Sequence, residues 1–464
     1  MPRSVFHHRT LIWTLVALTL ASGCGSPADA PQDSGSQADA TTDASVSSDA
    51  STLPRGVYAL TGIDPTLPVE DLAPLDDLLG DADIIGLGEN AHQCNTYIQA
   101  RDRITRYLVE RHGVRVVGLE TSRTNAETLE TYAQSCTGDP TTLLANLHPI
   151  WRGPELVDFL QWLCAHNQQH PADPVSLFGF DVVDQASTDA SELADFATVV
   201  MPSTDATAVE AGLGECPEVT SPAAHSSYTS CTTALDQLEA YVDAHVAEVI
   251  QATSETTLEW SRIWLASLRG ITGYRYLDQN PSDFLVAWGA RDEAMAEIVT
   301  RLRSLRFADG KTVLWAHNGH VANGMSTLQV IYPAIGIDFV WGVRSMGQAL
   351  AETPGTRYAA LGLTTYRFVA GASSYPLPPS PDNVTEPYLS ELLWTTPRPT
   401  GAPLLLDTSQ TGADALLTAD QQVLLRVRNN FRDADDFIQL TSPDALYDAM
   451  LWVEEATCGQ DWLP

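Results

Sequence analysis

Short apolar runs, each closed by a polar or ionisable residue, recur along the chain. The first, Ile84–Leu87, lies between Asp83 and Gly88-Glu89, a pattern typical of a strand buried on both faces. Similar runs predict strands at 114–119, 174–180, 312–316, 339–343, 358–363 and 403–406. Apolar positions at helical spacing predict helices at 96–112, 123–136 and 154–166. This alternation of strands and helices indicates parallel βαβ units.

A long helical segment follows. Residues 186–305 show no convincing strand pattern but carry several amphipathic stripes, such as Leu235, Leu238 and Val242. We therefore expect an α/β fold with a mostly parallel central sheet flanked by helices. The segment at about 186–305 is expected to be a helical insertion that caps the C-terminal edge of the strands. The tail from residue 420 also shows helical patterning.

The first 53 residues differ from the rest of the chain. Basic residues precede an apolar run at 11–20, which is too short for the roughly 20 residues of a transmembrane helix. Ala21-Ser22-Gly23-Cys24 follows it and resembles a bacterial lipobox. Residues 1–23 are therefore predicted to be a lipoprotein-type signal peptide, and Cys24 is predicted to carry a lipid anchor to the membrane. An ordinary cleaved signal peptide is the alternative, and both place the protein outside the cytoplasm, in the bacterial cell envelope.

The next segment has the composition of a disordered tether. Residues 25–53 contain five Asp and no Lys or Arg, with many Ser, Ala and Thr. Such a segment cannot bury enough apolar surface to offset its ordering entropy. The predicted organisation is thus a signal peptide (1–23), a tether (24–53) and one large folded domain (54–464), which we expect to be a monomer.

Charge and cysteine content limit the classes of partner and metal site that the sequence supports. The chain has 25 Lys and Arg against 59 Asp and Glu, a formal charge of −34, which argues against nucleic acid as a partner. Six cysteines besides Cys24 are compatible with disulfides in an exported protein, and Cys216 with Cys231 is the first pair expected. The chain has no Cys-x-x-Cys, so a structural zinc site has no support.

Candidate catalytic groups follow four of the predicted strands. Glu89, Glu120, Asp181 and His317 stand at or just beyond the strand ends, and His92 and His320 come three residues after Glu89 and His317. In open α/β sheets, ligands bind outside the carboxyl ends of the strands. These residues therefore predict one active site at that edge.

Two chemistries suit this set. In the first, His92 is a general base for water, Glu89 or Glu120 orients its ring, and an oxyanion is stabilised by His317, His320 or Arg101. In the second, His92, His317 and His320 with a carboxylate bind a divalent metal that activates water. The i, i+3 spacing of the histidine pair does not decide between them.

Three further residues are predicted to contact substrate: Trp151, in a segment at 147–155 that mixes aromatic and charged residues, together with Asp181 and Arg291. Simpler interpretations exist for the two arginines. Arg101 lies on an apolar helical stripe, where a snorkelling side chain is the alternative. Arg291 and Asp292 are neighbours in a predicted helix, where a surface ion pair is the alternative.

The run Gly88-Glu89-Asn90-Ala91-His92 resembles the Gly-Glu-x-x-His signature of the erythromycin esterase family. The resemblance continues through Arg101, Val117–Glu120, Phe178–Asp181, Arg291–Met295 and Trp315–His320, in the family's order. It implies an α/β core with a helical portion over the site, and a macrolide-lactone hydrolase that uses water without a serine nucleophile. It also implies His92 as the essential base, with Glu89, Arg101, Glu120, His317 and His320 in support, and no metal or other cofactor.

Departures from the family pattern concern the substrate. The family commonly has Ala-Thr or Ser-Thr at Asn90-Ala91, and Gly at Gln93, so the pocket rim is expected to differ. Cys94 is expected to form a disulfide. The leading hypothesis is an exported, lipid-anchored hydrolase of a small-molecule ester or lactone. A metal-dependent hydrolase of amide or peptide bonds and a non-catalytic envelope binding or assembly protein are the alternatives.

Overall fold

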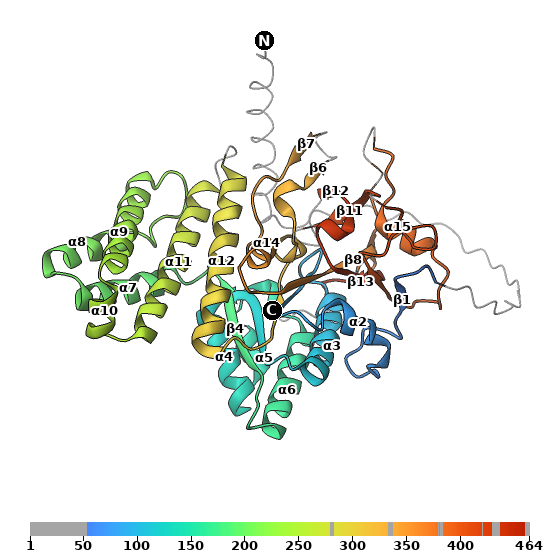
Figure 1. Ribbon diagram of the computed structural model, residues 1–464, viewed down its shortest axis with the longest axis horizontal. Helices are drawn as coiled ribbons and strands as arrows, with labels where there is room; N and C mark the ends of the chain where they lie inside the picture. The colour runs from blue at the N-terminus through green and yellow to red at the C-terminus, as the bar shows by residue number, and fades with distance from the viewer. Residues whose placement is uncertain are drawn as a thin grey trace, which may run out of the picture.

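The structure is a computed structural model that describes residues 53–145, 147–278, 283–332, 337–378, 380, 384–419, 421–428 and 437–459 (Figure 1). The predicted signal peptide and nearly all of the predicted tether lie outside these described residues. None of the helices in the described ranges is both long enough and apolar enough to cross a membrane.

A mixed sheet forms the centre of the fold, in the order β1-β10-β13-β8-β2-β5-β3-β4. Its parallel strands are β2 (Ile84–Leu87), β3 (Val116–Ser122), β4 (Ser176–Asp181), β5 (Thr312–Trp315), β8 (Tyr358–Ala370) and β13 (Ala449–Thr457). Antiparallel strands are β1 (Val57–Ala59) and β10 (Leu404–Asp407) at one edge, and β9 (Ser373–Tyr375) beside β8. The predicted α/β fold class is confirmed.

Both faces of this sheet are buried, as the apolar runs predict. Successive side chains point to opposite faces, so Ile84 packs into one core and Ile85 into the other. One face is covered by the early helices. These are α2 (Pro74–Leu78), α3 (Asn95–His112), α4 (Arg123–Ser135), α5 (Pro140–Leu144) and α6 (Pro154–Gln169), with short 3₁₀ turns η1 (Glu70–Leu72) and η2 (Pro149–Trp151). Helix α3 ends at Gly113, whose φ of 70° is the left-handed C-cap conformation that glycine allows.

The predicted helical insertion is present. It consists of α7 (Ala186–Val200), α8 (Ser203–Leu213), α9 (His225–Ala244), α10 (Val246–Ala252), α11 (Glu255–Leu277) and α12 (Phe284–Phe307), and no described residue between β4 and β5 is in a strand. Figure 1 shows α8, α9 and α10 well to the side of the sheet. Within the insertion, residues of α11 and α12 form the wall beside the strand ends. The part of the insertion that caps the sheet is therefore smaller than the whole insertion, which was expected to cap it.

The prediction of a helical tail was wrong. Beyond residue 420 the described chain forms β11 (Val423–Val427), β12 (Phe437–Thr441) and β13, with a 3₁₀ turn η5 (Pro443–Ala445). Strand β13 lies inside the main sheet, between β8 and β10. Strands β11 and β12 join β6 (Gln329–Tyr332) and β7 (Ile337–Val340) in a second, antiparallel sheet. A short apolar run such as Val423–Leu425 does not distinguish a buried strand from a buried helix.

The remaining helices are short: α13 (Asn318–Val321), η3 (Met325–Thr327), α14 (Met346–Ala351) and α15 (Leu389–Thr395). Three disulfides join Cys94 to Cys458, Cys136 to Cys164, and Cys216 to Cys231. The expected Cys216–Cys231 pair and the expected involvement of Cys94 in a disulfide are both confirmed.

Candidate active site

The structure brings the predicted ionisable residues to one edge of the main sheet. Glu89 and His92 follow β2, Glu120 lies in β3, Asp181 ends β4, and His317 follows β5. These four strands are neighbours in the order β2-β5-β3-β4 and run parallel. Their carboxyl ends therefore meet at the edge where α/β proteins bind ligands.

A backbone contact joins the loop after β2 to the loop after β5. A Cβ on Gly88 would collide with the side-chain oxygen of Asn318, so only glycine allows the loops to approach so closely. The Asn318 N–H donates to the Glu89 carbonyl at 2.7 Å, and its Nδ2 donates to the Leu363 carbonyl of β8 at 2.8 Å. Asn318 thus fixes the positions of Glu89 and His317 relative to each other.

His92 is held by a buried carboxylate. Its Nδ1 lies 2.6 Å from Oε1 of Glu89, and Oε2 of Glu89 accepts a hydrogen bond from Nη2 of Arg101 at 2.8 Å. If Nδ1 of a neutral His92 donates to Glu89, the lone pair is on Nε2. His92 also lines a cavity, so the ring has the arrangement of a general base.

Arg101 lies beneath this pair and does not snorkel. It is 1% exposed, paired with Glu89, and its guanidinium lies over the rings of Trp151 and Trp315 at 5.5 and 5.2 Å. The expected oxyanion role for Arg101 and the expected substrate contact of Trp151 are not supported, because neither is among the described residues that line the cavity. Trp151 instead donates from Nε1 to the Glu120 carbonyl at 2.8 Å.

A second ion-pair network surrounds Glu120. Arg291 donates to both carboxylate oxygens of Asp181, at 2.9 and 2.7 Å, and its Nη2 donates to Glu120 at 3.1 Å. The other Glu120 oxygen accepts the His317 N–H at 2.8 Å. The surface ion-pair interpretation of Arg291 and Asp292 is wrong, since both are buried and bind different partners.

His320 is the cation at the centre of this network. Its Nδ1 lies 2.7 Å from Asp292 and its Nε2 lies 3.3 Å from Glu120. Burial alone would lower the pKa of His320, but the two carboxylates outweigh it and raise the pKa to about 10. Burial likewise opposes ionisation of Glu120, yet His320, His92 and Arg291 hold its pKa well below the usual range. Glu120 and His320 are therefore both charged at neutral pH.

His317 is the neutral imidazole of the site. Burial and the nearby His92 lower the pKa of His317 to about 3. Its Nε2 donates to the Arg428 carbonyl at 2.8 Å, and its Nδ1 accepts the Gly319 N–H at 3.2 Å. The rings of His317 and His92 lie 5.2 Å apart. A neutral His317 adds no positive charge beside His92.

These groups surround a cavity of about 350 Å³, within the usual size range of ligand pockets. Its described lining residues are His92, Glu120, Thr121, His148, Ile150, Asp181, Val183, Asp184, Tyr274, Trp288, Arg291, His317 and His320. In the described part of the chain, no group of three or more His, Cys, Asp or Glu residues is arranged to hold a metal ion.

Sequence reasoning missed several residues of this site. Asp292 fixes His320, and Trp288 stacks on the His320 ring with centroids 5.2 Å apart. Tyr274 and His148 line the cavity. The helical spacing of Trp288 and Arg291, three residues apart on α12, is the signal that would have placed Trp288 on the same face.

The departures from the family pattern lie behind the pocket. Asn90, Ala91 and Cys94 are fully buried, and none of them is among the described lining residues. Asn90 accepts a hydrogen bond from the Tyr97 hydroxyl and donates to the Arg426 carbonyl at 3.3 Å. Gln93 is also not among the described lining residues, so these departures concern the support of His92 and not the described lining of the cavity.

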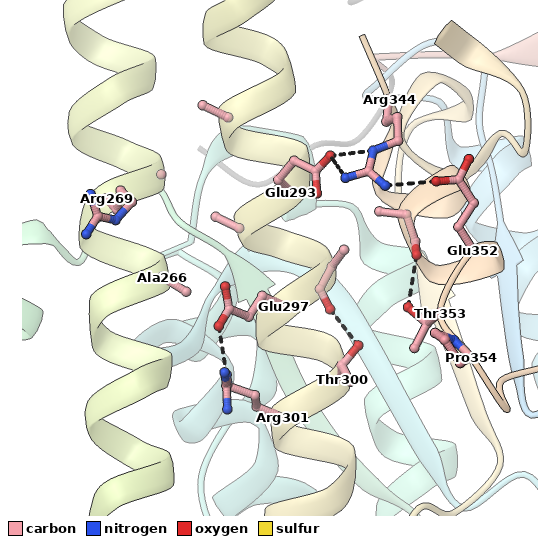
Figure 2. A pocket seen from close by; sticks show the side chains of 15 residues that line it. Ala266, Arg269, Glu293, Glu297, Thr300, Arg301, Arg344, Glu352, Thr353 and Pro354 are labelled. Carbon is pink, nitrogen blue, oxygen red and sulfur yellow. Dashed lines mark hydrogen bonds and ion pairs between the residues drawn. The ribbon is translucent and has the colours of Figure 1, made fainter. Parts of the chain in front are cut away.

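A larger hollow, of about 710 Å³, lies between α11, α12 and α14 (Figure 2). Figure 2 shows ion pairs among its charged side chains: Arg344 pairs with Glu293 and Glu352, and Arg301 pairs with Glu297. None of its described lining residues belongs to the network around His92. Its size therefore does not make it the active site.

A model of the erythromycin esterase family matches residues 109–456, which is well over half of the chain. The chain belongs to the erythromycin esterase family. The match includes Glu120, Asp181, Arg291 and the two histidines after β5, but it begins beyond Glu89, His92 and Arg101. The assignment of the His92–Glu89 pair in this family member therefore rests on geometry.

One curated relative and two solved structures are similar to this chain. Erythromycin esterase type I of Escherichia coli is 25% identical over 332 residues, covering 66% of this chain and 76% of its own. A mutant of the erythromycin esterase EreC in its open conformation is 18% identical with a TM-score of 0.61, covering 88% of this chain and 98% of that chain. A Bacillus cereus protein is 19% identical with a TM-score of 0.66, covering 87% and 96%. These structures show the same mixed α/β fold.

Proposed function

We propose that this protein hydrolyses an ester or lactone bond of a macrolide-type small molecule with water activated by His92. The observation that carries the proposal is that His92 is hydrogen-bonded to Glu89, and Glu89 to Arg101, at the wall of a cavity. Two positively charged side chains, Arg291 and His320, also line this cavity. A base, an orienting carboxylate and nearby positive charge are the groups that ester hydrolysis by water needs.

The proposed reaction begins when Nε2 of His92 takes a proton from water as the water oxygen bonds to the carbonyl carbon. The π electrons move to the carbonyl oxygen, and Arg291 and His320 stabilise the resulting negative charge. Glu89 stabilises the His92 imidazolium through Nδ1. The carbon–oxygen ester bond then breaks, and His92 returns its proton to the leaving alkoxide. The products are a carboxylic acid and an alcohol.

The test is hydrolysis of a 14-membered macrolide, followed as the mass gain of one water. His92→Ala is expected to abolish turnover, and Glu89→Gln to lower kcat by about 10²–10⁴-fold, because acid–base catalysis is typically worth that factor. Addition of a chelator is expected to change nothing. Loss of turnover on chelation would support the metal-dependent alternative, and turnover that survives in His92→Ala would refute the mechanism. No turnover in the wild type would remove macrolides as substrate.

We also propose export and lipid anchoring through Cys24. The predicted signal peptide supports export, and so do three disulfides, since disulfides persist in oxidising compartments and are rare in the cytosol.

A further inference from the structure

A second, smaller cavity adjoins the catalytic pocket, and we call it the annex. Its volume is about 180 Å³, and Tyr274, Trp288 and His317 line both cavities. Tyr274 comes from α11, Trp288 from α12 and His317 from the loop after β5. The annex therefore lies directly beside the site at His92.

The far side of the annex is apolar. Met325, Val330 and Val427 line it, and the last two come from the second sheet. Trp341 meets Trp288 edge to face, with ring centroids 5.8 Å apart. Such walls bind an aliphatic or alicyclic group, because burial of apolar surface drives its transfer from water.

Two residues that line the annex each carry a buried polar atom without a hydrogen-bond partner in the described part of the chain. Oε1 of Gln439 and Nε1 of Trp288 have no hydrogen-bond partner among the described residues, and Gln439 is 4% exposed. Gln439 lies on β12, an inner strand of the second sheet, and faces the annex. A buried acceptor left without a donor is costly, so its presence here indicates a ligand group that supplies one.

We propose that the annex is a substrate subsite that binds an aliphatic or alicyclic group bearing a hydroxyl, while the ester of the same molecule lies at His92. A hydroxyl both donates and accepts, so it matches the Gln439 carbonyl and the Trp288 N–H. An apolar cavity of about 150 Å³ holds one benzene-sized ring, so the annex takes one ring-sized portion of a larger substrate. This inference rests on the proposed esterase function for its link to catalysis.

The first test measures binding without turnover. Cyclohexanol and methylcyclohexane are titrated into the full chain and followed by ligand-detected NMR. Wild type is expected to bind cyclohexanol, and Gln439→Leu to bind it about tenfold more weakly while binding methylcyclohexane equally well. Val427→Phe, which fills the annex, is expected to bind neither. Val340→Phe is the matched control, because Val340 is 59% exposed on the same sheet, and it is expected to bind like wild type.

Equal cyclohexanol affinity in wild type and Gln439→Leu would refute the role of the hydroxyl. Equal affinity in wild type and Val427→Phe, or no binding by wild type, would refute the annex as a subsite. The second test compares kcat/KM for 4-hydroxycyclohexyl acetate and methyl acetate. The ratio is expected to fall at least tenfold in Val427→Phe and to stay unchanged in Val340→Phe. Cyclohexanol binding without hydrolysis of either ester or of a 14-membered macrolide would overturn the proposed function alone, whereas hydrolysis with an unchanged ratio would overturn the subsite alone.

Discussion

The charged residues of the site depend on contacts that are distant in sequence. Glu120 of β3 binds Arg291 of α12, 171 positions away, and Arg291 binds Asp181 of β4. Local patterns placed Glu120 and Asp181 at strand ends, because a polar residue closing an apolar run is visible in the sequence. They could not show that Arg291 is buried, since an arginine next to an aspartate in a helix reads equally well as a surface pair.

The pH dependence of stability follows from His320. Its pKa is about 10 in the folded protein, against about 6.5 for an ordinary histidine. Folding therefore favours the protonated ring, and this contribution is complete below pH 6.5 and is lost as pH rises to 10. Within this window the free energy of unfolding is expected to fall by at most about 1.4 kcal/mol per pH unit.

The measurement is urea unfolding at intervals between pH 6.5 and pH 10. His320→Gln is expected to be less stable than wild type at pH 6.5 and to show a shallower loss with rising pH. His170→Gln changes an exposed histidine at the C-cap of α6, outside the network, and serves as a control that should keep the wild-type slope. Identical slopes in wild type and His320→Gln would contradict the raised pKa.

Helices and strands whose own sequence carries a clear apolar pattern were predicted correctly. A strand whose identity depends on pairing with segments distant in the sequence was not. Four buried apolar runs each lead into a site residue, namely Glu89, Glu120, Asp181 and His317, so position in the sequence and role coincide. Strand β13 owes its identity to pairing with β8 and β10, which a local apolar pattern does not encode. The tail was therefore assigned the wrong element type.

The position of β13 gives the Cys94–Cys458 disulfide a role at the site. Cys458 follows β13, and Cys94 lies two residues after His92 at the start of α3, the helix that carries Arg101. Gln93, which lies between His92 and Cys94, has a φ of 62°. A non-glycine residue keeps this conformation only when its surroundings hold it. The Gly459 N–H donates to the Gln93 carbonyl at 2.9 Å. The disulfide thus fastens the His92 loop to the end of the sheet.

Replacing both cysteines, Cys94→Ser with Cys458→Ser, is expected to lower the free energy of unfolding by about 2–5 kcal/mol. It should also lower kcat, because His92 and Arg101 lose their fixed spacing. The matched control is Cys216→Ser with Cys231→Ser, which opens a disulfide of the helical insertion. That variant is expected to lose stability while keeping kcat at saturating ester. An equal effect of the two double variants on kcat would show that the Cys94–Cys458 bond has no positioning role.

At the scale of the whole molecule, the net charge bears on the proposed attachment to a membrane. The formal charge of −34 repels anionic lipid surfaces, so the folded part has no electrostatic attraction to them. The proposed attachment would therefore depend on a lipid at Cys24.

Cys24→Ser is accordingly expected to move the protein completely from the membrane fraction to the aqueous fraction. The wild type should partition into detergent on Triton X-114 phase separation, and its N-terminal peptide should carry the mass of a lipid. Hydrolysis by the released variant should match the wild type in detergent, because Cys24 lies far in sequence from the residues around His92. Membrane retention of Cys24→Ser would instead indicate a second attachment, on the folded surface, which the acidic charge does not favour.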